Sequence, residues 1–515
     1  MIILGLYFGH NASACVIEDG KVLINWELER FTRVKHDYGY NQEFIDKTLE
    51  HCNISMKNVD IIATNWNETI LHHVEKHTPH KLPPFKVPST KDATYKEFYK
   101  GYAINHHLCH AASAYYTSPF DNATIFSWDG GGDNENSAVS KGIGNKIIEY
   151  RPDKRNNVAS FWSSICFNNY RMKRIHDWDP GSGAGKVMGL ASYGTTNEDL
   201  ESELQKDLSN APQPHWHDPR ARAFNDCEDL SDTTQSFSQN VAATLQNYTK
   251  KKLIHEISLL PKNDNLCYAG GLALNCIANR EIIKNTDFNN LHVPPFPNDT
   301  GLAIGAALYV WHNILDNPIT PDDYFSPYTG PDYDVGTPDV QKVADLLRNN
   351  NIICYYEGRS ESGPRALGHR SILCNPGIPG VRDKLNEYVK HREWYRPYAP
   401  IILDKYASKY LSDYNEWSPY MQTSAVIKEE YREQLSGVNH VDNTTRPQIL
   451  KRKHNQTLYN IIEASGLPAL LNTSFNYQEP IVETPDQALQ TYINMGHVNA
   501  LVIGDEIYER NRNYI

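Results

Sequence analysis

The chain has 515 residues, which is more than one hydrophobic core usually serves, so we expect two or three domains. Hydrophobic residues make up 40% and charged residues 22% of the sequence, a globular composition that excludes an intrinsically disordered chain. The net charge of -12 argues against a protein that nucleic acid holds by bulk charge, although it leaves room for a local basic groove.

Neither a membrane anchor nor a disulfide scaffold is expected. The longest apolar stretch near a predicted helix, residues 301–311, is too short to span a bilayer. The N-terminal sequence MIILGLYFGH lacks the basic start of a signal peptide. The 9 Cys residues are scattered without a CxxC pair, so a thiolate zinc site is not indicated either. These features predict a soluble, cytoplasmic, multidomain protein.

A strand, a glycine-rich polar turn and a second strand are predicted twice. Residues 2–8 form an apolar run that ends at Gly9-His10-Asn11, and a second run follows at residues 14–17. Residues 123–128 form a similar run, which ends in the turn DGGGD at residues 129–133. The repeat favours a duplicated α/β architecture, although two unrelated hairpins would give the same pattern.

Three more elements are predicted between and after these runs. Residues 103–116 contain good helix formers, with Asn105 placed as a helix cap. Residues 266–269 are typical of a buried strand that runs into a Gly-Gly turn. Residues 301–311 are typical of a packed helix, whose small residues allow a neighbour to approach closely.

The domain boundary is predicted within residues 316–340. This segment is crowded with Pro, Asp and Gly and lacks helical periodicity. We therefore expect a first domain over residues 1–335 and a second α/β domain over residues 343–515.

A metal site is indicated by a histidine pair and two carboxylates. His106 and His110 are four residues apart in the predicted helix, so both rings leave the same face, whereas His107 points elsewhere. Asp129 ends a buried strand and Asp299 immediately precedes a helix. Two imidazoles and two carboxylates suit Fe(II), Mn(II) or Zn(II) rather than Ca(II). Two ordinary helix histidines and a helix-capping aspartate would give the same pattern.

Two glycine-rich segments could contact phosphate groups. The sequence PGSGAGKVMG, from Pro180, lacks the first Gly of a Walker A loop and has Val187 where that loop needs Ser or Thr, so it is not one. It still places Lys186 beside a glycine-rich turn. Gly270, Gly271 and Asn275 follow a strand and open a helix, where free N–H groups favour a nucleotide, although tight packing explains such a turn equally well.

A basic cluster stands out in this acidic chain. Residues 359–396 carry eight Lys or Arg against four Asp or Glu. Clustered arginines bind phosphate and carboxylate oxygens bidentately, so their place among Gly, Pro and aromatic residues favours a pocket for small anions over a solvated basic face. The candidate residues of this region are Arg359, Arg365, His369, Arg370, Lys390, Arg392 and Arg396. Farther along the chain, Arg446 and the motif NTSFN, with Asn472 and Ser474 at a strand end, add further polar groups.

Seven motifs in a fixed order carry a resemblance to a known family. They are GHNASA from Gly9, HHLCHAASAYY from His106, DGGGDNENS from Asp129, GKVMGLASYG from Gly185, GGLALNC from Gly270, GPRALGHRSIL from Gly363 and NTSFN from Asn472. Together they resemble the O-carbamoyltransferase family, often called NodU/CmcH, along nearly the whole chain.

The resemblance implies a fold and a reaction. It implies a duplicated actin-like ATPase domain of the threonylcarbamoyl-transferase type (ASKHA), followed by a YrdC-like α/β domain. Carbamoyl phosphate would be converted to carbamate and adenylated by ATP in the second domain. The carbamoyl adenylate would then give its carbamoyl group to an acceptor hydroxyl at an iron site in the first domain. Mg²⁺ is expected to accompany the ATP.

The resemblance also implies residue roles. His106, His110, Asp129 and Asp299 would be the ligands of Fe(II), or alternatively of Mn or Zn. The residues that would serve catalysis are His10, Asn11, Lys186 and Arg365. The residues that would bind ATP and carbamoyl phosphate are Gly270, Gly271, Asn275, Lys390, Arg396, Arg446, Asn472 and Ser474.

The acceptor stays open on the sequence. A sugar or other small natural product, or a hydroxymethylpyrimidine in a nucleotide or in DNA, would each supply the hydroxyl. Alternatives are a threonylcarbamoyl-type transferase acting on tRNA and a non-catalytic, nucleotide-sensing actin-like scaffold. A homodimer would be common for a soluble enzyme of this size.

Overall fold

The computed structural model places the chain in two compact units. The first unit comprises Met1–Thr32 and His36–Phe325, and the second comprises Arg33–Lys35 and Ser326–Ile515. The transition at Phe325 falls inside the proline-rich segment where a boundary was predicted. The structure describes residues 1–39, 41–65, 80–88, 95–133, 135–153, 155, 158–172, 183–210, 229–319 and 325–510.

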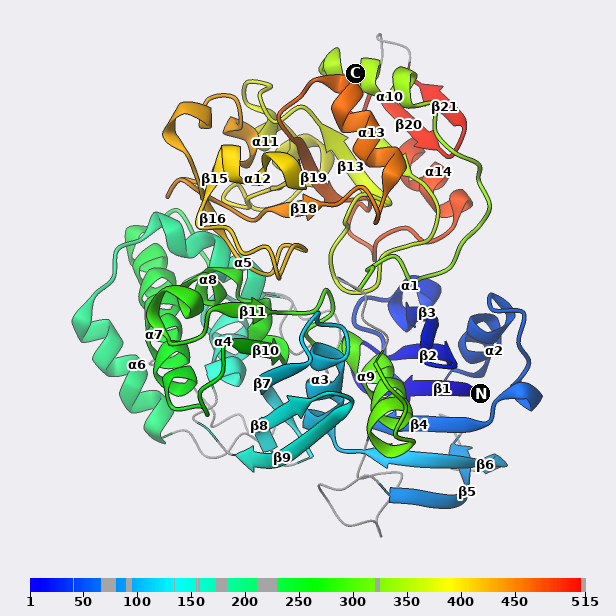
Figure 1. The fold of residues 1–515 in the computed structure, drawn as a ribbon. Coiled ribbons are helices and arrows are strands. Elements are labelled where there is room, and N and C mark those ends of the chain that lie inside the picture. The colour runs from blue at the N-terminus through cyan, green and yellow to red at the C-terminus, as the bar shows by residue number, and fades with distance from the viewer. Residues whose placement is uncertain are drawn as a thin grey trace. The chain divides into compact units, whose positions relative to one another are not determined.

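The first unit begins with a six-stranded sheet of order β3-β2-β1-β4-β6-β5 (Figure 1). The central strand β1 pairs antiparallel with β2 and parallel with β4, and β4 pairs parallel with β6. The strands are β1 (Ile2–Tyr7), β2 (Ser13–Glu18), β3 (Lys21–Glu27), β4 (Ile61–Asn65), β5 (His80–Pro88) and β6 (Tyr95–Ile104).

The second sheet of this unit repeats the same plan. Its order is β11-β10-β7-β8-β9, with β7 antiparallel to β8 and parallel to β10. Each sheet thus has a central strand that enters an antiparallel hairpin on one side and two parallel strands on the other, which confirms the predicted α/β duplication. The strands are β7 (Asn122–Gly132), β8 (Glu135–Ile143), β9 (Lys146–Asp153), β10 (Asn265–Ala269) and β11 (Asn290–His292).

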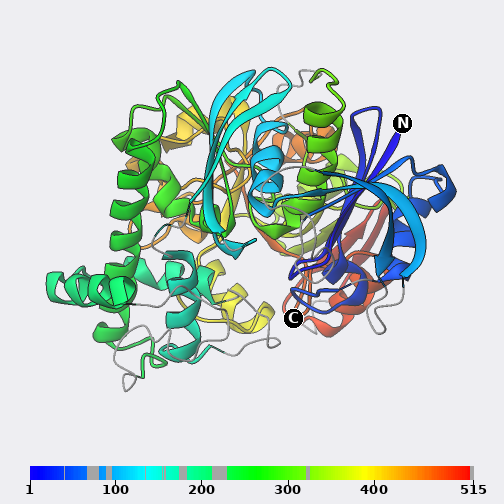
Figure 2. The same ribbon diagram turned by 90° about the horizontal axis from the view of Figure 1, so that it is seen from below.

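Two helices lie side by side between these sheets. Helix α3 (His106–Tyr115) packs on the second sheet, and α9 (Leu302–Leu308) packs on the first (Figures 1 and 2). Small residues let them approach, because a Cβ at Gly305 would lie 2.0 Å from the carbonyl oxygen of Cys109. The helix predicted at residues 301–311 is confirmed, and it continues as a π-helical turn (Tyr309–Ile314).

Strand β1 is apolar throughout because both of its faces are covered. Leu4 and Leu6 join a hydrophobic cluster with Phe44 and Leu49 of α2, whereas Gly5 faces Ala303 of α9 on the opposite side. The remaining helices of the unit are α1 (Leu28–Thr32), α2 (Gln42–Glu50), α4 (Val158–Asn168), α5 (Ala184–Leu190), α6 (Glu198–Asn210), α7 (Ser236–Ser258) and α8 (Cys276–Asn285).

The second unit is built on a seven-stranded mixed sheet of order β18-β14-β19-β13-β12-β20-β21. A small sheet of order β15-β16-β17 accompanies it. The strands are β12 (Ile353–Tyr356), β13 (Arg370–Cys374), β14 (Ala399–Leu403), β15 (Leu411–Ser412), β16 (Ala425–Ile427), β17 (Thr444–Thr445), β18 (Gln448–Leu450), β19 (Leu470–Ser474), β20 (Ala500–Ile503) and β21 (Glu506–Glu509).

Alternate residues of these strands enter two different cores. Ile353 and Tyr355 of β12 pack in one cluster with α10 and α13, and Cys354 and Tyr356 pack in the other with α14. The sheet is therefore covered on both faces, as expected for an α/β domain. The helices are α10 (Val340–Arg348), α11 (Val381–Lys384), α12 (Asp404–Tyr410), α13 (Gln456–Ser465) and α14 (Pro485–Asn494).

Within the described residues, every helix is too short or too polar to traverse a lipid bilayer.

Candidate functional site

The predicted histidine pair lies on one face of α3. Asn105 caps the helix by accepting hydrogen bonds from the N–H groups of His107 and Leu108, as predicted. The Nε2 atoms of His106 and His110 are 3.1 Å apart. His107 points away from this pair, as expected from its place on the helix, and its Nδ1 lies 2.9 Å from Ser127 Oγ.

The two carboxylates reach the same place from different elements. Asp129 lies in β7 where the pairing with β8 becomes irregular, between Trp128 and Gly132. Its Oδ1 accepts a hydrogen bond from the Gly130 N–H at 2.5 Å, and its Oδ2 accepts one from the Gly271 N–H at 2.7 Å. Asp299 opens the 3₁₀ turn η4 (Asp299–Gly301) that leads into α9.

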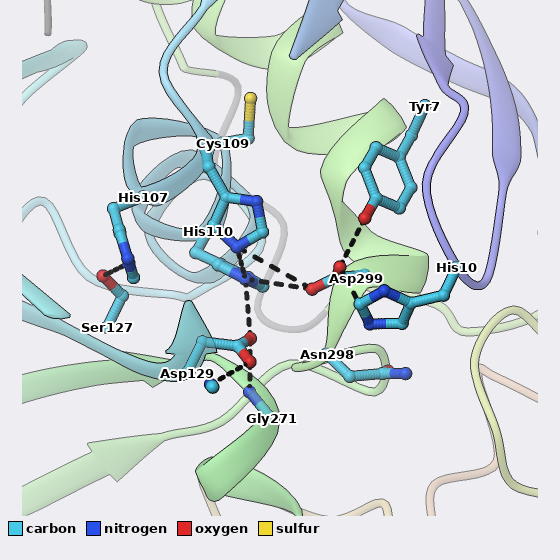
Figure 3. Close-up of polar contacts among 12 residues, drawn as sticks. Tyr7, His10, His107, Cys109, His110, Ser127, Asp129, Gly271, Asn298 and Asp299 are labelled. Carbon is cyan, nitrogen blue, oxygen red and sulfur yellow. Dashed lines mark hydrogen bonds and ion pairs between the residues drawn. The ribbon is translucent and has the colours of Figure 1, made fainter. Parts of the chain in front are cut away.

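These four side chains form one cluster. One ligand atom from each of His106, His110, Asp129 and Asp299 lies within 4.8 Å of the others. His110 Nε2 is 3.1 Å from Asp129 Oδ2 and 3.4 Å from Asp299 Oδ1, as Figure 3 shows. Ligand atoms about 2.1 Å from a shared ion lie about 3.0 to 3.4 Å apart when they are neighbours in its shell. The cluster therefore fits one divalent cation with two nitrogen and two oxygen donors.

Burial and charge set the protonation of this cluster. Burial lowers the pKa of His106 to about 4, which leaves its imidazole neutral and able to coordinate a metal. Burial also lowers the pKa of His110, but hydrogen bonds to Asp129 and Asp299 outweigh it and raise the pKa to about 9. Without an ion, His110 therefore carries a proton between the two carboxylates, and a cation would have to displace it.

Tyr7 and His10 lie on the other side of Asp299 (Figure 3). The Tyr7 hydroxyl donates a hydrogen bond to Asp299 Oδ2 at 2.5 Å, and His10 Nε2 lies 3.1 Å from the same oxygen. Burial and the charge of Asp299 raise the pKa of Tyr7 well above its usual range, so its hydroxyl keeps the proton that it donates. His10 was predicted as a site residue, whereas Tyr7 was missed. Its position at the end of the central strand β1 was the available signal.

Asn11 follows His10 in the same turn and contacts His36. It has a left-handed backbone, with φ of 61°, and its Oδ1 lies 2.6 Å from His36 Nδ1. The Asn11 side chain thus holds the turn that presents His10.

The prediction of free N–H groups at Gly270 and Gly271 is wrong. The Gly270 N–H donates to the carbonyl oxygen of Pro297 at 2.7 Å, and the Gly271 N–H donates to Asp129. Asn275 is also engaged, because it caps α8 and exchanges two hydrogen bonds of 3.1 Å with Gln246. The strand, turn and helix are as predicted, but these polar groups organise the protein and the Asp129 ligand.

Lys186 lies in the first turn of α5 and is half-buried. The start of its motif, Pro180–Ser182, lies outside the described residues. Its role toward phosphate therefore stays a prediction.

In the second unit, Arg365 is carried by a loop that buried side chains hold in place. Glu361 is 1% exposed, and its Oε1 accepts hydrogen bonds from the N–H groups of Leu367, His369 and Arg370 at 2.7, 2.8 and 3.2 Å. Glu361 was missed in the sequence analysis, because an acidic residue in a basic motif was counted only as charge. The carboxylate is the organising centre of the loop.

The NTSFN motif also helps to hold the loop that carries Arg365. Nδ2 of Asn472 and Nε2 of Gln448 each donate a hydrogen bond of 2.9 Å to the carbonyl oxygen of Ala366. Asn472 thus contacts Ala366, the residue that follows Arg365 in the sequence. Ser474, at the end of the same strand β19, accepts a hydrogen bond from Lys390 through its carbonyl oxygen at 2.8 Å. Strand β19 thus contacts both Lys390, through Ser474, and the residue that follows Arg365, through Asn472.

Lys390 is a buried cation. Its Nζ also donates hydrogen bonds of 2.6 Å to the carbonyl oxygen and to Oδ1 of Asn476. Burial lowers the pKa of Lys390 well below its usual range, and the charge of Arg392 lowers it further. The donors of Nζ are thus directed at oxygens of Ser474 and Asn476, and the predicted role of Lys390 toward an anion stays a prediction.

Arg446 and Arg396 differ in how they are satisfied. Arg446 is 8% exposed, and its Nη2 has no hydrogen-bond partner among the described residues. Arg396 is half-buried and pairs with Glu393 at 3.2 Å. A buried guanidinium edge that the protein leaves unsatisfied is costly unless a ligand completes it.

Two arginines of the basic cluster do not have the anion-binding role that the sequence indicated. They hold the backbone instead. Arg359 donates to the carbonyl oxygens of Gly330 and Thr329 at 2.9 and 2.7 Å. Arg370 is fully buried over the ring of Tyr356 and donates to the carbonyl oxygen of Glu357. Both guanidinium groups satisfy backbone carbonyls and stabilise the fold.

Comparison with known proteins adds a family to this geometry. The family model described as carbamoyltransferase N-terminus matches residues 2–105 and 90–308, and that described as carbamoyltransferase C-terminus matches residues 344–510. Nodulation protein NolO of Bradyrhizobium diazoefficiens is 32% identical over 78% of this chain and 78% of its own length. Nodulation protein U of Sinorhizobium fredii is 28% identical over 93% of this chain and 94% of its own.

Solved structures are more distant. Component A of (R)-2-hydroxyglutaryl-CoA dehydratase from Acidaminococcus fermentans is 12% identical, with a TM-score of 0.37 over 60% of this chain and 98% of that chain.

Proposed function

Because this chain belongs to the carbamoyltransferase family, as its motifs predicted, we propose that it transfers a carbamoyl group from carbamoyl phosphate, through a carbamoyl adenylate formed with ATP, to an acceptor hydroxyl. Carbamoyl transfer follows from the family. The ATP-dependent route and the acceptor class are the parts that we propose.

One observation carries the proposal for the first unit. His106, His110, Asp129 and Asp299 gather around one position, and His10 lies beside it, 3.1 Å from Asp299. A divalent cation bound there, Fe(II) or alternatively Mn or Zn, would neutralise phosphate charge and polarise nearby oxygens. An acyl transfer to a hydroxyl needs a base as well as charge neutralisation, and His10 supplies an imidazole.

The transfer step moves the carbamoyl group from AMP to the acceptor oxygen. The acceptor oxygen bonds to the carbamoyl carbon, the bond from that carbon to the AMP phosphate oxygen breaks, and AMP leaves. The hydroxyl proton moves to His10. Because Nε2 of His10 lies toward Asp299, we assign Nδ1 as the nitrogen that takes the proton. Tyr7 and Asn11 then have positioning roles.

The cations of the second unit support the activation step. Water hydrolyses carbamoyl phosphate to carbamate, phosphate and a proton, and a carbamate oxygen then attacks the α-phosphorus of ATP, which breaks the bond to the β-phosphate and releases pyrophosphate. Arg365, Lys390 and Arg446 would balance the phosphate charge, with Nη2 of Arg446 as the group that the protein leaves without a partner. The predicted folds of the two units agree with transfer in the first unit and activation in the second. The duplicated strand order of the first unit supports an actin-like assignment, and the YrdC-like identity of the second unit stays a prediction.

Product analysis tests the route. Purified protein with carbamoyl phosphate, ATP and Mg²⁺ should release AMP, pyrophosphate and phosphate, and release of ADP alone would contradict the proposal. Arg446→Gln should weaken adenylate formation through a raised KM for carbamoyl phosphate, whereas His110→Ala should keep adenylate formation and lose transfer. Lys453→Ala, an exposed basic change in the same unit, is the matched control and should keep both.

The acceptor class requires a screen. We propose a hydroxyl on a small natural product or sugar, or on a hydroxymethylpyrimidine in a nucleotide or DNA. Radiolabelled carbamoyl phosphate offered with representatives of each class would identify the acceptor as the one that becomes labelled only with intact His10.

A further inference from the structure

The two oxygens of Asp299 have different surroundings. Oδ1 faces the histidines, 3.4 Å from His110 Nε2 and 3.9 Å from His106 Nε2. Oδ2 faces the opposite way, 2.5 Å from the Tyr7 hydroxyl and 3.1 Å from His10 Nε2 (Figure 3). One oxygen is thus directed at the cluster and the other is held by the first strand and its turn.

The room for the Tyr7 hydroxyl comes from a missing side chain. A Cβ at Gly9 would lie 2.2 Å from the Tyr7 oxygen and 2.5 Å from the ring carbon that bears it. Tyr7 itself is 6% exposed, so its ring has little space to move aside. Any side chain at position 9 would therefore displace the hydroxyl from Asp299.

We infer that Tyr7 is a positioning residue that fixes the Asp299 carboxylate so that Oδ1 alone faces a bound cation, and that Gly9 gives its hydroxyl the room to do so. The inference rests on the ion site in the proposed function and adds a residue that orients one of its ligands. A carboxylate held at one oxygen cannot rotate to bind through both. Partners of this kind typically change metal affinity 10- to 100-fold, roughly, when they are removed.

The test measures the binding of Mn²⁺ alone to purified, metal-stripped protein. Tyr7→Phe removes only the hydroxyl and should weaken Mn²⁺ binding by about 10- to 100-fold, while the unfolding midpoint of the metal-free protein stays close to that of the wild type. The matched control is Tyr116→Phe, which removes another buried hydroxyl, one that donates to the Asn145 carbonyl at 3.1 Å. It should leave Mn²⁺ affinity unchanged.

Gly9→Ala provides a second, independent variant. It should weaken Mn²⁺ binding as Tyr7→Phe does, and the double variant should bind no more weakly than the weaker single variant, because both changes break the same contact. Affinity of Tyr7→Phe within twofold of wild type, or an equal loss in Tyr116→Phe, would overturn the inference.

Failure of the inference and failure of the proposed function give different results. Mn²⁺ binding needs no carbamoyl donor or acceptor, so a negative transfer assay leaves this comparison valid. His106→Ala is the reference for loss of the ion site. If His106→Ala binds Mn²⁺ as well as the wild type, the ion site is elsewhere and the role of Tyr7 fails with it.

Discussion

Arg446 and Arg359 show how two arginines of one basic cluster can have opposite roles. Arg446 keeps a buried Nη2 without a partner among the described residues, whereas Arg359 donates to two backbone carbonyls. The residue types are identical, and nothing in the local sequence separates them. Only the contacts made by the guanidinium show which one is left for a ligand.

Arg446→Gln and Arg359→Gln should therefore separate activity from stability. Loss of an arginine–phosphate contact removes about 2–3 kcal/mol of binding, so Arg446→Gln should raise KM for carbamoyl phosphate by roughly 30- to 150-fold. Its unfolding midpoint should stay the same or rise, because a buried charge is removed. Arg359→Gln should lower the midpoint and change KM much less. Steady-state kinetics and denaturant unfolding of both variants would show it, and the reverse pattern would refute the assignment.

Several site residues were accessible from the sequence because spacing alone fixed their geometry. His106 and His110 share a helix face by periodicity, and their meeting with Asp129 and Asp299 is observed. Glu361 and Tyr7 were missed because their roles depend on partners brought by the fold. The prediction of free N–H groups at Gly270 and Gly271 was wrong for the same reason, since their acceptors, Pro297 and Asp129, come from distant segments.

At the scale of elements, the contact between α3 and α9 holds the ion cluster together. Helix α3 carries both histidine ligands, and Asp299 lies just before α9. Gly305 lets the two helices approach, because a Cβ there would lie 2.0 Å from the Cys109 carbonyl oxygen. The separation of these helices therefore sets the distance between Asp299 and the histidines.

Gly305→Ala should push the helices apart. The expected results are a loss of about 1–3 kcal/mol of stability from overpacking and weaker binding of a divalent cation. Gly185→Ala is the control, since a Cβ at this helical glycine meets nothing within 4 Å. It should leave cation binding unchanged and stabilise the protein slightly. Calorimetric titration and thermal unfolding measure both effects, and equal behaviour of the two variants would contradict the role of the helix contact.

The loop that carries Arg365 depends on a single carboxylate. Glu361→Ala leaves three buried N–H groups without their acceptor, so we expect a loss of about 2–4 kcal/mol and a raised KM for carbamoyl phosphate. Glu430→Ala, an exposed change in the same unit, should alter stability by less than about 0.5 kcal/mol. Hydrogen exchange of the segment that contains Leu367 and His369 should accelerate in the Glu361 variant alone. Unchanged exchange there would show that other contacts hold the loop.

At the scale of the whole molecule, each unit contains a buried histidine that folding keeps neutral. Burial lowers the pKa of His312 in the first unit and of His369 in the second. Below about pH 6.5 the unfolded chain binds a proton at each ring and the folded chain does not, so the free energy of unfolding falls as the pH falls.

The expected loss is about 1 kcal/mol per histidine per pH unit below about pH 6.5, until the lowered pKa is reached. Denaturant unfolding of the wild type and of His369→Asn at pH 7.5 and 5.5 would measure it. The variant should lose less stability over this interval than the wild type. An equal loss in both proteins would show that His369 does not contribute.

The strand runs, the helix cap at Asn105 and the change of composition before Ser326 made much of the architecture predictable. Hydrophobic runs and turns identify strands, but they do not state which strands are neighbours. The order of the seven-stranded sheet depends on long-range pairings such as β13 with β19, which local patterns do not encode. Family membership supplied the function that these elements serve.

The shared plan of the two sheets in the first unit has a consequence for how the chemistry is divided. Strands β1 and β7 are topological counterparts, yet one is followed by His10 and the other contains Asp129. Two copies of one scaffold therefore present unlike side chains to a common point, an imidazole from the first and a carboxylate from the second. Engineering that aims at a different reaction should alter this asymmetry between the counterpart turns, because the framework that supports them is the same on both sides.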